Sequence, residues 1–77
     1  MLPFLTENPS ALISKKFLLK QTQDVDVTWT PGEVLRQSGA RRRNILFDVS
    51  IEGEEAVSTI AILYEIRKGH LVLIESE

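Results

Sequence analysis

Two side chains of this 77-residue chain are candidates for a general base. Asp48 stands between two apolar residues of an alternating segment, where partial enclosure would suit a carboxylate that takes up protons. His70, the single histidine, is of the residue type that titrates near neutral pH. Either residue could serve an isomerase-, cyclase- or thioesterase-like enzyme. A solvated strand carboxylate and an exposed turn histidine are the simpler interpretations, so the sequence favours a protein without catalytic activity.

A run of three arginines is the most conspicuous polar feature. The guanidinium groups of Arg41, Arg42 and Arg43 could bind a phosphate, a carboxylate or the backbone of a nucleic acid. A solvated loop before a strand is the alternative. Because the calculated isoelectric point is only 5.4, nucleic-acid binding is disfavoured.

Aromatic residues suggest a ligand pocket. Trp29, Phe47 and Tyr64 could line a site for a small apolar ligand, since aromatic walls with a polar tip suit such sites. The same three side chains could instead anchor a core or an interface without any ligand. We predict them as ligand-binding residues of a non-catalytic module.

Composition excludes several other classes. The chain has no cysteine and one histidine, so thiolate metal sites, disulfides and histidine clusters are absent. Glutamates gather around Gly53 but do not follow a calcium-loop pattern, and no phosphate-binding glycine motif is present, so no metal or cofactor is expected. No apolar run is long enough to span a bilayer, and we expect a cytoplasmic protein without a membrane partner. Residues 1–8 are predicted as an irregular arm and residues 9–77 as a single domain.

The first regular element is predicted to be a helix. Asn8 is a good N-cap residue, and Pro9 suits the first helical position because its missing N–H costs no hydrogen bond there. Apolar residues then recur at helical spacing, with lysines largely opposite. The pattern predicts an amphipathic helix over residues 9–21.

Beyond the helix, apolar residues alternate with polar ones, as in strands with one buried face. Strands are predicted over residues 24–30 and 44–53, with a turn at Pro31–Gly32 and a short strand and a loop between them. Residues 56–66 and 71–74 are apolar on both faces.

Gly69 is expected to supply the positive φ of a tight turn between these last two segments. Strands that are apolar on both faces must be covered on both faces, and one helix covers only one side of a sheet. The sequence therefore predicts a homodimer that forms through the face of the sheet.

The order of these segments resembles the later part of a nuclear-transport-factor-two-like domain, a superfamily that includes ketosteroid-isomerase-like and polyketide-cyclase-like proteins. The similarity covers residues 9–77, through the segments SALISKKFLL, NILFDVSIEG, EEAVSTIAILYEIRKG and HLVLIESE. It implies a curved antiparallel sheet wrapped into a cone, often dimeric through its outer face. Family members carry further helices ahead of the sheet, so this chain would be a shortened form. None of the family's catalytic residues maps to a numbered position here, and the resemblance implies a scaffold without an activity.

The sequence thus predicts an α+β fold, in which one N-terminal helix packs on a curved, cone-like antiparallel sheet of four or five strands. The predicted function is a small-molecule-binding or protein-interaction module that acts as a homodimer.

Overall fold

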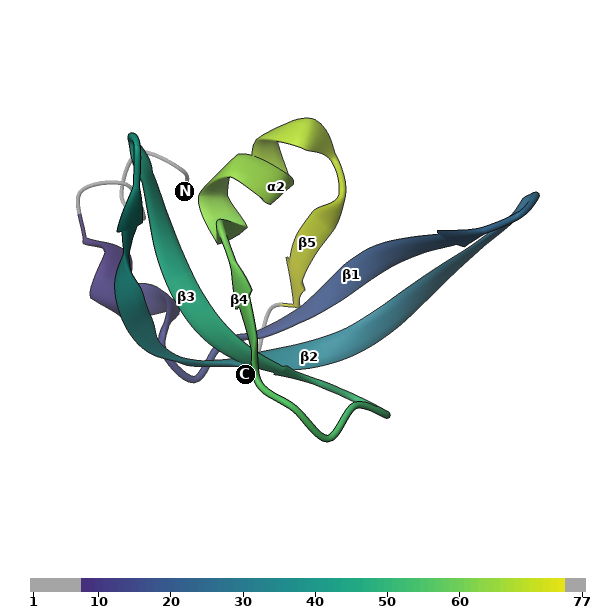
Figure 1. The fold of residues 1–77 in the computed structure, drawn as a ribbon, viewed down its shortest axis with the longest axis horizontal. Helices are drawn as coiled ribbons and strands as arrows, with labels where there is room; N and C mark the ends of the chain where they lie inside the picture. Colours follow the sequence, from purple (N-terminus) through teal and green to yellow (C-terminus); the bar gives the residue numbers. More distant parts are fainter. Residues whose placement is uncertain (1–7, 75–77) are drawn as a thin grey trace.

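A five-stranded antiparallel sheet makes up most of the computed structural model, which describes residues 8–74 (Figure 1). The strands lie in the order β4-β3-β2-β1-β5, so the first and last strands of the chain are neighbours. In chain order the elements are the 3₁₀ helix η1 (Pro9–Leu12), strands β1 (Lys16–Gln23), β2 (Asp26–Arg41), β3 (Asn44–Ile51) and β4 (Ser58–Ile60), helix α2 (Ile62–Lys68) and strand β5 (Leu71–Ile74).

The helix predicted over residues 9–21 is wrong. Helical turns cover only Pro9–Leu12, and the backbone of Ser14 then adopts a left-handed conformation with φ of 74°, which cannot continue a helix. The following residues form β1, in which Phe17 is fully buried and Lys16 is exposed. Two of the lysines that suggested the outer side of a helix, Lys16 and Lys20, instead lie on one face of a strand, because alternate strand residues point to opposite faces.

The single strand predicted over residues 56–66 is also wrong. β4 ends at Ile60, and α2 begins at Ile62, whose side chain is fully buried. Apolar residues that would point to both faces of a strand therefore lie on one face of a helix, because residues three and four positions apart are neighbours on a helix surface. Gly69 does have a positive φ, of 84°, but it ends α2 as a left-handed cap and does not form a hairpin turn.

β2 runs through the predicted Pro31–Gly32 turn without interruption. Pro31 lies opposite Leu18 of β1, and its carbonyl accepts a hydrogen bond from the N–H of Glu52, one residue beyond the end of β3. The missing N–H of proline therefore falls where the β3 ladder has stopped, and it removes no bond between paired strands. Register irregularities at Val34/Arg36 and Gln37/Gly39 then bend the far half of β2, as Figure 1 shows.

The core lies between the sheet and α2, with η1 at one side. Helix α2 contacts β3 and β5, so it covers the inner face of the curved sheet (Figure 1). Eight residues from η1, four strands and α2 form one buried cluster: Leu12, Phe17, Val34, Phe47, Val49, Ile51, Ile62 and Leu71.

The predicted fold class is therefore corrected. The antiparallel sheet is confirmed, but the helix that packs on it is the short C-terminal-side helix α2, and no helix precedes the sheet in the described part beyond the single turn of η1. Residues 1–7 of the predicted arm lie outside the described residues. Over residues 8–74, no helix combines the length and apolar character that a membrane crossing needs.

One close contact at the centre of the sheet fixes the position of the largest core side chain. Phe17 lies opposite Gly32, and a Cβ built on Gly32 would lie 2.5 Å from Cζ of the Phe17 ring and 2.8 Å from the carbonyl oxygen of Ser50. These distances are far below van der Waals contact. The ring of Phe17 therefore occupies the space that any other residue at position 32 would fill with its side chain.

We expect Gly32→Ala to lower the free energy of unfolding by about 1–3 kcal/mol, the usual cost of overpacking a core. Urea denaturation of the variant and the parent chain measures this loss. In a Phe17→Leu background the same substitution should cost less, because the ring has been removed. Equal costs in the two backgrounds would show that the Phe17 ring is not the origin of the effect.

Candidate interaction face

The outer face of the sheet, opposite α2, carries an apolar patch. Cross-strand neighbours in an antiparallel pair share a face, and the register aligns Val72 with Leu18 and Leu18 with Pro31 in one row across three strands. Val72 is 45% exposed. We define the outer-face patch by these residues and their same-face neighbours: Leu18, Val27, Trp29, Pro31, Val72 and Ile74.

The exposure of this patch is unusual for apolar side chains. Trp29 is 42% exposed and Val27 is 50% exposed, whereas the apolar residues of the inner face at Phe17 and Val34 are buried. Neither η1 nor α2 covers the patch in the part of the chain that the structure describes, since their buried residues Leu12 and Ile62 belong to the core cluster. An exposed, contiguous apolar surface of this kind marks a contact site.

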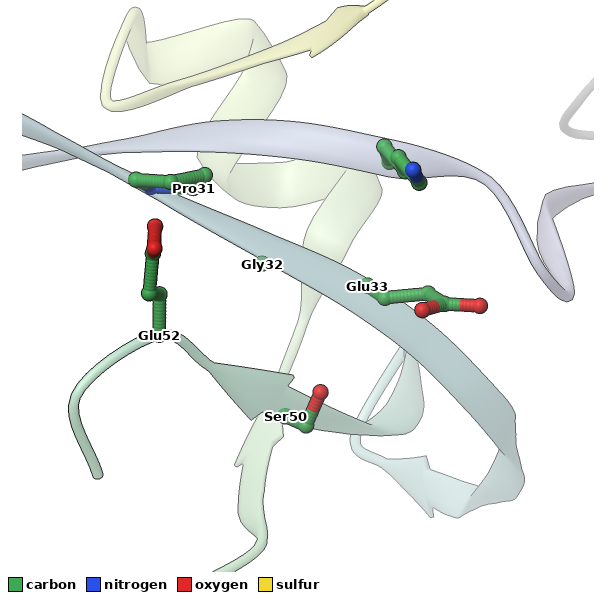
Figure 2. A pocket seen from close by; sticks show the side chains of 6 residues that line it. Pro31, Gly32, Glu33, Ser50 and Glu52 are labelled. Atoms are coloured by element: carbon green, nitrogen blue, oxygen red, sulfur yellow. The ribbon is translucent and has the colours of Figure 1, made fainter. Parts of the chain in front are cut away.

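Charged residues of both signs flank the patch on the same face. Lys16 lies opposite Glu33, and Lys20 lies opposite Trp29. Lys16 and Glu33 also line an open depression of about 280 Å³ next to the patch, together with Pro31, Gly32, Ser50 and Glu52 (Figure 2). Glu33 and Glu52 bring two carboxylates to this depression, Lys16 an ammonium and Ser50 a hydroxyl.

The three aromatic residues predicted to line a ligand pocket are not brought together. Phe47 is fully buried in the core, Trp29 lies on the outer face, and Tyr64 lies on α2 with its ring near the ammonium of Lys68, 5.3 Å from the centroid. None of them lines the depression beside Gly32. Only Trp29 keeps the role of a candidate contact residue, because it belongs to the outer-face patch.

Asp48 is fully engaged in contacts within the sheet. Its Oδ2 accepts a hydrogen bond from Nε of Arg36 at 3.0 Å, and its Oδ1 accepts one from the hydroxyl of Thr59 at 3.0 Å. These partners lie on the two neighbouring strands, β2 and β4, directly opposite Asp48 in the register. The carboxylate therefore ties three strands together, and these contacts account for it without a catalytic role.

His70 forms a pair with a carboxylate at the end of α2. Nδ1 of His70 lies 2.9 Å from Oε1 of Glu65, and its backbone carbonyl accepts a hydrogen bond from the N–H of Lys20. The histidine side chain is about half exposed. Over the described residues, no group of three or more histidine or acidic side chains is placed to hold a metal ion.

The arginine run forms the tip of the β2–β3 hairpin. Arg41 pairs with Asn44, so Arg42 and Arg43 make a two-residue turn, and Arg42 has a positive φ of 58°. All three arginines are exposed. The predicted loop is thus a tight hairpin, and the three exposed arginines are consecutive at its end.

Sequence reasoning missed most of the outer-face patch, although a signal for part of it was present. Residues 71–74 were correctly expected to be apolar on both faces, and Val72 and Ile74 supply that second face. Leu18 and Pro31 could not be assigned to the patch, because their segments were expected to form a helix and a turn.

We expect Asp48→Asn to lower the free energy of unfolding by no more than about 1 kcal/mol, because Arg36 is 66% exposed and solvent screens the ion pair. Arg36→Gln removes the same pair and should cost a similar amount. Chemical denaturation of both variants measures these effects. A loss several times larger for Asp48→Asn than for Arg36→Gln would indicate a role for the carboxylate beyond this pair and Thr59.

No family model, curated protein or solved structure matches this chain. The relationship to nuclear-transport-factor-two-like proteins therefore stays a prediction. The functional assignment rests on the geometry of the described residues.

Proposed function

We propose that this chain is a non-catalytic protein-interaction module that associates with a second copy through the outer face of its sheet. The observation that carries this proposal is the outer-face patch, which spans β1, β2 and β5 and includes an exposed tryptophan. Tryptophan is among the residues most enriched at the energetic centres of protein interfaces. The exposed apolar residues form a continuous surface, whereas isolated ones would need no explanation.

The charges around the patch favour a second copy as the partner. In a twofold arrangement with its axis between β1 and β2 and along the strands, β1 of one copy lies over β2 of the other. Because Lys16 and Glu33 occupy one row, each lysine would then lie over the partner's Glu33. The next row along β1 would place Leu18 over the partner's Pro31.

The third row extends this self-complementarity. Lys20 and Trp29 are cross-strand neighbours, so the same rotation would place the ammonium of Lys20 over the partner's Trp29. A cation over an indole ring is a favourable contact. Two sheets packed in this way would lie about 10 Å apart, with strands crossing at about 30° because each sheet is twisted. The face thus combines apolar area with charge pairs that match a copy of itself.

The geometry favours this function over small-molecule binding. The depression beside Gly32 is open, and its side chains are mainly charged or hydroxylic. Small-molecule sites are concave and mostly apolar, with a few convergent polar groups. The predicted aromatic pocket is absent from the described residues, since Phe47 and Trp29 lie on opposite faces of the sheet.

The test compares Val72→Asp with Val57→Asp. Both valines are about equally exposed, at 45% and 52%, but Val72 lies in the outer-face patch and Val57 precedes β4 at the other edge of the sheet. Sedimentation velocity over a concentration series should show a dimer for the parent chain and for Val57→Asp. Val72→Asp should be a monomer at the same concentrations, because the same rotation places Val72 over the partner's Glu52, and two carboxylates held together in an interface repel each other.

A parent chain that remains monomeric at every concentration would overturn the proposal. Dimers that persist equally in Val72→Asp and Val57→Asp would place the interface elsewhere. Circular dichroism and urea denaturation of both variants establish that they keep the parent fold, so that a monomer is not confused with an unfolded chain.

A further inference from the structure

The β2–β3 hairpin ends in a basic two-stranded ribbon. β1 pairs with β2 only as far as Glu33, and β4 pairs with β3 only over Phe47–Val49. Beyond these pairs, residues 39–46 are hydrogen-bonded only to each other, and the ribbon rises from the rest of the sheet (Figure 1). It carries Arg41, Arg42 and Arg43 at its tip.

The tip arginines have no acidic partner within the part of the chain that the structure describes. No carboxylate of residues 8–74 lies within ion-pair distance of Arg41, Arg42 or Arg43, whereas Arg36 further down the hairpin is paired with Asp48. Three adjacent, exposed guanidinium groups repel one another, so the tip gains from binding an anion. Each group can donate two parallel hydrogen bonds to a phosphate.

The acidic residues gather at other ends of the molecule. Asp24 and Asp26 lie at the β1–β2 turn, and Glu52, Glu54 and Glu55 lie between β3 and β4. Figure 1 shows the β1–β2 turn at the right, the β3–β4 connection at the bottom and the basic tip at the upper left. Although the net charge of the chain is −2, its acidic and basic residues therefore lie at different ends of the molecule, and the local electrostatic potential at the tip is positive.

We propose that the tip of the β2–β3 hairpin binds the phosphate backbone of nucleic acid without reading its sequence. A two-stranded ribbon is narrow enough to enter the major groove of a DNA duplex. The tip offers guanidinium groups, which donate paired hydrogen bonds to phosphate. Because a guanidinium group in the major groove can also bind guanine, similar affinity for sequences of different guanine content is the outcome that marks contact with the backbone alone. A polyanion fits this arrangement better than a single small anion, because the three arginines lie exposed along a hairpin turn.

This inference is independent of the proposed self-association, because no tip residue belongs to the outer-face patch. A dimer would carry two tips, so self-association would raise the apparent affinity for a long duplex without changing the affinity of each tip.

The test measures binding of the full chain to short fluorescent DNA and RNA duplexes of two unrelated sequences, by anisotropy at several salt concentrations. We expect similar affinity for the two sequences and weaker binding as the salt concentration rises. Arg41→Gln/Arg43→Gln should weaken binding by roughly tenfold or more and lower the salt slope by about two, since each lost phosphate contact contributes about one.

Arg67→Gln/Lys68→Gln is the matched control. It removes the same two charges from exposed positions at the end of α2 and should leave the affinity nearly unchanged. Arg42→Gly is a second test that does not threaten the fold, because the φ of 58° at this position suits glycine. It should reduce binding while keeping or raising the thermal midpoint of unfolding.

Several results would overturn the proposal. They are the absence of binding to either duplex, binding that does not change with salt, or an equal loss in the tip and control variants. If the tip variants instead abolish a salt-sensitive association of the protein with itself, the partner of the tip is an acidic surface of a second copy and the nucleic-acid proposal is wrong. The DNA and RNA arms identify which duplex is the better ligand.

Discussion

The contact between the Phe17 ring and the backbone of Gly32 determines how the rest of the sheet is assembled. Phe17 belongs to β1, the strand that pairs with both β2 and β5, and Gly32 lies where β2 pairs with both β1 and β3. The ring rests on the backbone of β2, where a side chain would otherwise stand. This position brings the ring into the cluster formed with Val34, Val49 and Ile51, and the inner face is filled without a second layer of strands.

The same contact explains why the two faces of the sheet differ. Phe17 and helix α2 fill the inner face. The apolar residues of β1, β2 and β5 that point to the outer face therefore have no packing partner within the described residues. Leu18 and Val72 are neighbours of the buried Phe17 and Leu71 along their strands, and they project to the other side. The interaction proposed for the outer face is thus a consequence of how the inner face is packed.

The strands with clear alternation could be predicted from the sequence, and the elements set by tertiary contacts could not. Residues 44–51 alternate without interruption, and β3 is found there. Residues 16–19 (KFLL) fit a helix and a strand equally well, and pairing with β2 and β5 decides in favour of the strand. Residues 60–66 fit both periods as well, and the need to cover the inner face selects the helix. Tyr64 is separated from the other two predicted pocket residues because its segment forms α2, and Trp29 and Phe47 are separated because β2 and β3 present them on opposite faces of the sheet.

The pairing of β1 with β5 has a consequence for the order in which the chain folds. Lys16 and Ile74 are direct neighbours although more than 50 residues separate them in sequence. Such a contact closes a long loop, and its entropic cost must be met before the pairing contributes to stability. Strands β1, β2 and β3 can pair through two short hairpins, but one edge of β1 stays open until the C-terminal strand arrives. During synthesis, this edge therefore exposes its backbone hydrogen-bonding groups and the side chain of Leu19 until nearly the whole described chain has left the ribosome. Strands of two different chains pair wrongly most easily during this interval.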